Sequence, residues 1–420
     1  MAKAPVIVSA IDIGTSQINV LVGEVTGDSV EVIGRGVASS GGAVGKGEIR
    51  NMDQAGKALE AALNQADDSS GNQLLRSKLV TLLVSGGGIR CSGGVGSAMV
   101  RKGVVGEEEM NEARTNAQVI ELPSDWQIIN TDDIYWRLDN RRVGYPLNQR
   151  GRKLEAKVLI VQGHVPRIDN LYNLVKGFDL ENAAVFPVFS PICTKVGIMT
   201  ERELDEGSVL VDLGAGCTDY LSAHDGGVLD AGTLQLGFDH VANDLAIGLK
   251  LPFAGCRKLF ENGVLNEAFA RNQSTISIEK PMGGFREIRL CHFETIIKAR
   301  LREIFEEVER KMPNYSGVRQ GTGILTGGGA LYAPALEVFS EVFQMPCRVG
   351  SVADASGSLT NLDSPRYSAV WGALKVAAEY YRVSSGGRSE GAIQGFINGM
   401  NNMWFYLPRE IGKLWKAFKL

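Results

Sequence analysis

The sequence predicts a duplicated α/β fold whose two lobes close on one phosphate chain. Residues 6–14 and 208–214 are both apolar, β-branched runs that end in Asp, an apolar residue and Gly. Each is followed by a small polar turn and then returns as a second and a third strand. An Asp-x-Gly strand end presents a carboxylate and backbone N–H groups together, which suits phosphate oxygens and hydrated Mg²⁺. One such hairpin is commonplace, but two in matching halves indicate one shared site.

A third glycine-rich element supports the same fold. Residues 323–326 are a short apolar strand, followed by Gly327, Gly328 and Gly329 and then by an apolar-periodic run over 331–343. Glycines between a strand and a helix let a ligand approach the backbone at a helix N-terminus. Alone, this is an ordinary strand-to-helix turn. After two Asp-x-Gly hairpins, it predicts the nucleoside side of a nucleotide site.

Composition limits the classes of function. A chain of 420 residues suggests two or more domains, and 44% hydrophobic with 22% charged residues is typical of a soluble globular protein. The 44 basic and 48 acidic residues give a net charge of −4, which offers no general case for nucleic acid. No apolar run has the length of a membrane span. The first apolar run is too short for a signal peptide and is interpreted as the first strand.

The cysteines and histidines do not form a metal-binding pattern. Six cysteines and four histidines are scattered along the chain, with no C-x-x-C pair. Buried or incidental thiols in a reducing compartment explain this pattern better than zinc does. We therefore expect a cytoplasmic protein.

Changes in composition and hydrophobic pattern along the chain predict two core subdomains, each carrying an insertion. A helix over 53–65 and a strand over 79–84 belong to the first core, whereas glycine-rich strands and an acidic helix start at Glu107–Glu109 mark an inserted module. Apolar residues at helical spacing over 293–308 predict an amphipathic helix in the second insertion. The expected boundaries are 1–85 with 166–205 (first core), 86–165 (first insertion), 206–237 with 314–382 (second core), 238–313 (second insertion), 383–402 (flexible linker) and 403–420 (terminal helix).

The last 18 residues have the pattern of an interfacial helix. A Ser/Gly-rich linker at 384–391 precedes them, and Pro408 suits a first helical turn. At about 100° per residue, one arc is apolar and aromatic and an adjoining arc is basic, the signature of a helix lying in a membrane surface. The residues expected at the membrane are Trp404, Leu407, Ile411, Lys413, Leu414, Trp415, Lys416 and Phe418. The alternative is a terminal helix docked on the protein's own core.

The order of these motifs carries a family resemblance. The matching stretches are Asp12–Ser16, Val22–Val25, Gly144–Leu147, Gly151–Ala156, Pro281–Gly284, Arg300–Glu303, Leu325–Ala330 and Ser364–Gly372. Hairpin, insertion, hairpin, insertion and triple glycine is the order of the actin-like ATPase superfamily. Within it, the chain resembles the bacterial cell-division family FtsA over essentially its whole length. The resemblance implies an actin-like fold, a duplicated ribonuclease H-like two-lobed α/β architecture with an inserted α+β subdomain and a C-terminal amphipathic helix.

The resemblance also implies a ligand set. It predicts ATP and Mg²⁺, with Asp12 and Asp212 holding the hydrated metal. Cofactor contacts are expected at Asp12, Gly14, Thr15, Ser16, Gln17, Asp212, Gly214, Ala215, Gly216, Cys217, Gly237, Arg257, Lys258, Gly327, Gly328 and Gly329. No catalytic residue is assigned, and the protein is expected to be at most a slow ATPase.

The partners follow from the same resemblance. The C-terminal tail of the tubulin homologue FtsZ is expected to bind at Arg300 and Glu303. Further copies of the chain are expected as partners in a filament, and other division proteins are expected to bind the insertion at 86–165. The terminal helix is expected to bind anionic lipid. These features place the protein on the cytoplasmic side of the inner membrane at the division site. Alternatives are an FtsA-like adaptor of pilus assembly and, less favoured, an actin-superfold small-molecule kinase, for which no candidate catalytic acid is present.

Three departures from the family pattern bear on the nucleotide. Gln17 stands where such proteins usually carry Lys, and the second turn has Ala215 and Cys217 where Gly and Thr are usual. The stretch 255–258 replaces a segment that usually supplies an acid for the ribose, so no such acid is expected. These changes favour slow or absent hydrolysis, because positioned cations and donors stabilise the transition state of phosphoryl transfer.

Overall fold

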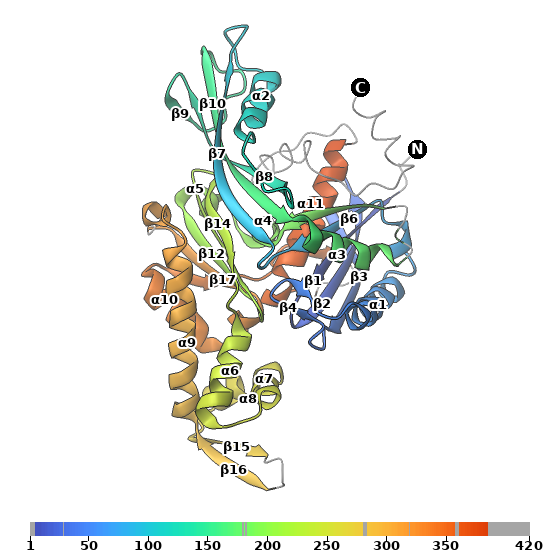
Figure 1. Cartoon of the computed structure of the whole chain (residues 1–420), viewed down its shortest axis with the longest axis vertical. Coiled ribbons are helices and arrows are strands. Elements are labelled where there is room, and N and C mark those ends of the chain that lie inside the picture. The colour runs from blue at the N-terminus through green and yellow to red at the C-terminus, as the bar shows by residue number, and fades with distance from the viewer. Residues whose placement is uncertain are drawn as a thin grey trace.

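The computed structural model describes residues 5–384, except 28, 179, 181–182, 280–283, 319 and 358–360. The linker beyond 384 and the predicted helix over 403–420 lie outside the described residues. Two sheets occupy the middle of the molecule, with one inserted subdomain at each end of the long axis (Figure 1). Within the described residues, no helix is long and apolar enough to cross a bilayer.

The first lobe is built on a six-stranded sheet, in the order β11-β6-β1-β2-β3-β19. Its strands are β1 (Val6–Ile13), β2 (Gln17–Thr26), β3 (Ser29–Ser39), β6 (Leu79–Val84), β11 (Ala184–Phe189) and β19 (Ser356–Gly357). Helix α1 (Met52–Ser69) packs on β2 and β3, whereas α11 (Ser368–Ser384) packs on β1 and β6. Because β1, β6 and β11 are covered by helices, they are nearly uniformly apolar and buried. Two short strands, β4 (Val44–Gly45) and β5 (Glu48–Ile49), pair beside this sheet.

The second lobe repeats the first, with a five-stranded sheet in the order β14-β13-β12-β17-β18. Its strands are β12 (Ser208–Leu213), β13 (Thr218–His224), β14 (Gly227–Leu234), β17 (Thr322–Thr326) and β18 (Cys347–Val349). In each lobe the Asp-x-Gly strand pairs antiparallel with the strand after the turn and parallel with a later strand. Asp12 pairs with Asn19 and Asp212 with Asp219, the same seven-residue separation. The predicted duplication is thus confirmed down to its register.

The triple glycine departs from the expected strand-to-helix turn. Gly328–Leu331 form a 3₁₀ turn, and α10 (Ala333–Phe343) begins only after Tyr332, which is extended. Proline at the start of α10 fits the first helical turn, because its missing N–H would have had no partner there. The glycines therefore form a separate turn between the strand and α10, and the helix itself begins later than the predicted 331.

The first insertion forms a four-stranded sheet with one helix, and it has its own small core. Its elements are β7 (Ile89–Met99), α2 (Glu107–Ala117), β8 (Trp126–Leu138), β9 (Arg141–Val143) and β10 (Lys153–His164). Helix α3 (Val165–Lys176) follows β10. The insertion is joined to α4 (Ser190–Ile198) by a buried ion pair, in which Lys195 Nζ lies 2.5 Å from Asp132 Oδ2.

The second insertion is mostly helical and lies at the opposite end of the molecule (Figure 1). It contains α6 (Phe238–Leu249), α7 (Phe253–Glu261), α8 (Val264–Ala270), β15 (Thr275–Glu279), β16 (Phe285–Arg289) and α9 (Leu290–Arg310). The amphipathic helix predicted around 293–308 is confirmed as α9, whose apolar stripe is buried against α6 and α10. Helix α5 (Glu201–Glu206) connects α4 to the second sheet.

Candidate functional site

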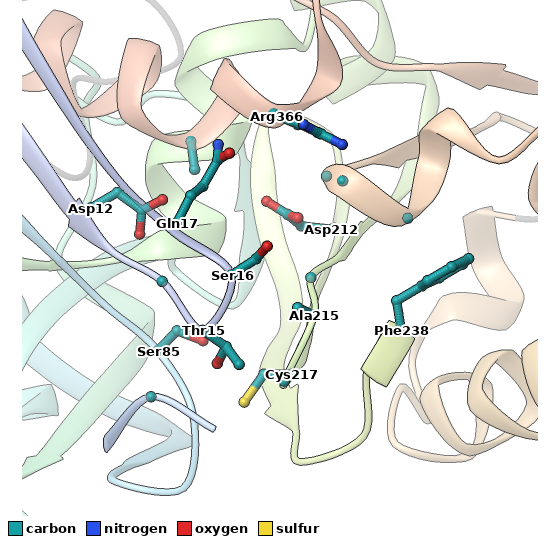
Figure 2. A pocket seen from close by; sticks show the side chains of 18 of the residues that line it. Asp12, Thr15, Ser16, Gln17, Ser85, Asp212, Ala215, Cys217, Phe238 and Arg366 are labelled. Atoms are coloured by element: carbon teal, nitrogen blue, oxygen red, sulfur yellow. The ribbon is translucent and has the colours of Figure 1, made fainter. Parts of the chain in front are cut away.

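The two hairpin turns face one another across a cavity of about 220 Å³. Figure 2 shows Thr15 and Ser16 of the first turn opposite Ala215 and Cys217 of the second. The turns approach so closely that a β-carbon on Gly216 would lie 2.4 Å from Thr15 Oγ1. The Thr15 hydroxyl accepts a hydrogen bond from the Lys46 backbone N–H at 3.1 Å. Both lobes therefore contribute backbone to one wall of a single site.

Three aspartates line the cavity near the hairpin turns: Asp219 is buried, and Asp12 and Asp212 are half-buried. Burial raises the pKa of Asp12 to about 6, against a hydrogen bond from Asn19 that lowers it. Burial raises the pKa of Asp212 to about 8, and the charges of Asp219 and Asp12 add to the effect. Burial also raises the pKa of Asp219 to about 6, although the Ser85 hydroxyl donates to its carboxylate at 2.6 Å. Like charges close together in a poorly solvated site disfavour the state in which all of them are ionised. These carboxylates would therefore be stabilised in their ionised form by a nearby positive charge.

A hydrated divalent cation fits this arrangement. It would supply the positive charge that favours the ionised carboxylates. Among the described residues, no three His, Cys, Asp or Glu side chains are grouped so that they could hold a metal directly. Mg²⁺ retains several waters and is commonly held by one or two carboxylates and by substrate phosphates. Asp12 and Asp212, which the sequence analysis assigns to the hydrated metal, both line this cavity, and their metal role stays a prediction.

Gln17 takes part in a neutral hydrogen-bond relay that ends on Asp12. Its side-chain amide donates to Asn19 Oδ1 at 2.9 Å, and Asn19 Nδ2 donates to Asp12 Oδ2 at 3.1 Å. The relay orients the carboxylate but brings no countercharge, unlike the lysine that is usual in the resembled family. The side chain at position 17 therefore adds no positive charge to this end of the cavity.

We expect Gln17→Lys to tighten Mg²⁺-ATP binding by roughly tenfold, because a hydrogen bond to a charged group contributes more than a neutral one. The gain should shrink at high salt as screening increases. Isothermal titration calorimetry at low and high ionic strength measures both effects. Gln54→Lys adds the same charge on the exposed face of α1 and should leave affinity unchanged. Equal gains in the two variants would exclude a local role for residue 17.

Cys217 is a neutral thiol in the second turn. Burial and then the charge of Asp219 raise the pKa of this thiol to about 12. A thiol is a weak hydrogen-bond donor compared with a hydroxyl. A threonine at this position would present a stronger hydrogen-bond donor to the cavity than the thiol does.

The far end of the cavity is aromatic and charged. Phe238 and Phe260 line it, with their ring centroids 4.6 Å apart in an edge-to-face contact. Arg257 and Glu261 of α7 also line it, together with Asp239 of α6. The acids at this end come from α6 and from the end of α7, and the stretch 255–258 supplies none. Gly327, whose φ is +83°, lies where the two ends meet, since a β-carbon there would lie 2.2 Å from Asp212 Oδ1.

Most of the predicted cofactor residues meet in this cavity. Those that line it are Asp12, Gly14, Thr15, Ser16, Gln17, Asp212, Gly214, Ala215, Gly216, Cys217, Arg257, Gly327, Gly328 and Gly329. Gly237 and Lys258 are not among the lining residues. Gly237 lies behind the second turn instead, because the Phe238 and Asp239 backbone N–H groups bond to the carbonyls of Gly214 and Ala215.

Sequence reasoning missed Asn19, Ser85, Asp219, Phe238, Asp239, Phe260, Glu261 and Arg366, all of which line the cavity. For Asn19 and Asp219 a signal exists, since both stand seven residues after the hairpin aspartate. Ser85 follows a buried strand and precedes three glycines, a pattern like that of 323–329. The others carry no local signal.

Arg300 and Glu303 lie together on α9, away from the cavity. Arg300 Nε lies 2.6 Å from Asp244 Oδ2, and its Nη1 lies 2.7 Å from Glu303 Oε2. About a quarter of the Arg300 side chain is exposed. The arginine thus already has two carboxylate partners, one of them on α6.

Comparisons with known proteins agree with this architecture. Residues 209–372 match the family model described as cell division protein FtsA, and residues 86–162 match the SHS2 domain inserted in that protein. Cell division protein FtsA of Pseudomonas aeruginosa is 28% identical over 372 residues, covering 87% of each chain.

Two solved structures share the fold. One comes from the PilM-PilN type IV pilus biogenesis complex, with a TM-score of 0.57 and 14% identity over 88% of this chain and 98% of that one. The other is MreB5 of Spiroplasma citri bound to ADP, with a TM-score of 0.51 and 13% identity over 87% of this chain and 94% of that one. At such identity the likeness establishes the actin-like fold, as predicted.

Proposed function

Since this chain belongs to the FtsA family of cell-division proteins, we propose that it is an ATP-binding adaptor that ties FtsZ filaments to the inner face of the cytoplasmic membrane. The observation that carries the proposal is the pair of hairpin turns that face each other across one cavity, which the Asp12 and Asp212 carboxylates also line. An anion bound there meets backbone from both lobes at once. Occupancy of the cavity would thereby fix the angle between the lobes, which a filament-forming protein requires.

ATP with Mg²⁺ is the proposed ligand. Asp12 and Asp212 would hold the hydrated metal, the two turns would contact phosphates, and Gly327–Gly329 would lie against the nucleoside. When bound, the metal would neutralise phosphate charge. Gln17 and Cys217 replace a cation and a hydroxyl that usually take part, so hydrolysis is expected to be slow or absent. The nucleotide would then act mainly as a structural ligand.

A fluorescent fusion of the full chain tests the adaptor role in dividing cells. The expected result is a mid-cell ring that disappears when FtsZ is depleted. A diffuse cytosolic signal in cells with intact FtsZ rings would contradict the adaptor role and favour the small-molecule kinase. Fluorescence concentrated at the cell poles would instead favour the pilus-assembly alternative.

We expect Arg300→Glu to weaken binding of an FtsZ C-terminal tail peptide by about tenfold, because reversal replaces attraction to the peptide's acidic residues with repulsion. The new carboxylate also faces Asp244 and Glu303. Fluorescence anisotropy of a labelled tail peptide measures the effect, and circular dichroism checks the fold.

Arg302→Glu is the matched control, since Arg302 lies on the same helix and forms an ion pair with Glu341 instead. This variant should bind the peptide nearly as well as the parent chain. Unchanged affinity in Arg300→Glu would remove Arg300 from the site. Equal losses in both variants would show that general charge, rather than a position on α9, governs the interaction.

A further inference from the structure

The two ends of the nucleotide cavity differ in chemistry. The two hairpin turns and the carboxylates of Asp12, Asp212 and Asp219 form the phosphate end. The other end, which we call the nucleoside half, is lined by α6, α7, the glycines 327–329 and Arg366. Figure 2 shows Phe238 and Arg366 near the glycine turn and away from Asp12. A triphosphate placed at the first end directs its base into this half.

The charged side chains that α6 and α7 contribute to the nucleoside half form ion pairs with one another. Arg257 Nε lies 3.0 Å from Glu261 Oε1 and 3.5 Å from Asp239 Oδ1. Among the described residues that line this half, none is Asn, Gln, Ser or Thr. The side chains therefore offer no neutral hydrogen-bonding group to read the edge of a base.

The nucleoside half instead offers flat side chains against which a base can stack. Phe238 packs against the glycine turn, since a β-carbon on Gly329 would lie 2.9 Å from its Cδ2 atom. Phe260 meets Phe238 edge to face, so the two rings support each other. The Arg366 guanidinium lies beside Gly328, with Nε 3.8 Å from the position of a β-carbon there. Arg366 is exposed.

We propose that the nucleoside half binds a purine by stacking against Arg366 and Phe260, and that it accepts adenine and guanine nucleotides without distinguishing them. Adenine and guanine differ in donors and acceptors at their edges, N6 against O6. A site discriminates strongly only when its own buried polar groups lose partners with the wrong ligand. Aromatic rings and guanidinium planes instead bind any base through its π-face.

This inference rests on the proposed nucleotide function, and calorimetry on the full chain with Mg²⁺ separates the two. The probes are ATP, GTP, CTP and inorganic tripolyphosphate. ATP and GTP are expected to bind within about threefold of each other, and CTP on the order of tenfold more weakly because its ring is smaller. Tripolyphosphate should be weaker still. A preference of more than about fiftyfold for ATP over GTP would overturn the proposal.

Variants locate the stacking contact. Arg366→Ala should weaken ATP and GTP equally, by about tenfold, and leave tripolyphosphate unchanged. Phe260→Leu should act the same way while keeping an apolar side chain. Phe269→Leu is the control, because Phe269 meets Tyr332 in the same aromatic cluster but does not line the cavity.

Three results would count against the proposal. An equal loss of tripolyphosphate and ATP affinity in Arg366→Ala would make Arg366 a phosphate ligand and overturn the stacking role. Tripolyphosphate that binds as tightly as ATP would overturn the base site alone. Absence of binding by every probe would overturn the nucleotide function and this inference together.

Discussion

Gly216→Ala is expected to lower Mg²⁺-ATP affinity on the order of a hundredfold, the equivalent of losing two hydrogen bonds to a charged phosphate. The added β-carbon would lie 2.4 Å from Thr15 Oγ1 and 2.9 Å from the Lys46 nitrogen. Real β-carbons do not approach so closely, so the two turns must separate. The phosphate chain would then be held from one lobe only. Titration calorimetry measures the loss, and thermal unfolding shows whether the lobes remain folded.

Gly255→Ala provides the matched control for this substitution. Gly255 lies in α7, and a β-carbon there would meet nothing within 4 Å. Alanine also has the higher helix propensity, so this variant should bind ATP like the parent chain and be slightly more stable. If Gly216→Ala bound ATP as tightly as the control, the facing turns would not be the phosphate site.

Truncation after Ser389 is expected to abolish sedimentation with anionic liposomes. Half-burying the six large apolar side chains of 403–420 contributes on the order of 5–8 kcal/mol, and four basic residues near anionic lipid add roughly 1 kcal/mol each. Ordering a helix that is marginal in water offsets much of this. One copy should therefore bind weakly, and a filament should bind firmly through avidity.

Point variants separate the terminal helix from the rest of the tail. Trp415→Glu, or Lys413→Glu together with Lys416→Glu, should release the full chain from vesicles without unfolding it. Asn398→Glu adds a negative charge in the linker and should leave binding nearly unchanged. If the truncated chain sedimented as well as the full chain, the membrane contact would lie elsewhere in the protein.

The phosphate end of the site was predictable because its information is local. An Asp, a Gly and a turn residue lie within five positions of each other, so a strand ending there necessarily presents them together. The repeat of this pattern in residues 12–16 and 212–216 then predicted that the two copies share a ligand. The shared register of Asp12 with Asn19 and of Asp212 with Asp219 shows how complete the duplication is.

The nucleoside half was predicted less well because tertiary packing assembles it. Phe238, Glu261 and Arg366 come from α6, α7 and the turn before α11, more than 100 residues apart at the extremes. No spacing rule brings them together. Lys258 illustrates the difficulty: it is one residue from Arg257 in sequence, but a helix turns successive residues by about 100°, and only Arg257 lines the cavity.

The buried pair of Lys195 and Asp132 has a consequence for the evolution of this chain. Both side chains are at least 96% buried, and they join α4 to β8 of the first insertion. Removing one partner of such a pair costs about 3–5 kcal/mol, whereas replacing both by apolar residues of similar volume is often neutral. A single change at either position is therefore expected to be strongly destabilising, whereas a simultaneous change of both to apolar residues is not. Across divergent relatives the two positions should covary, so that the attachment of the insertion is inherited as a unit.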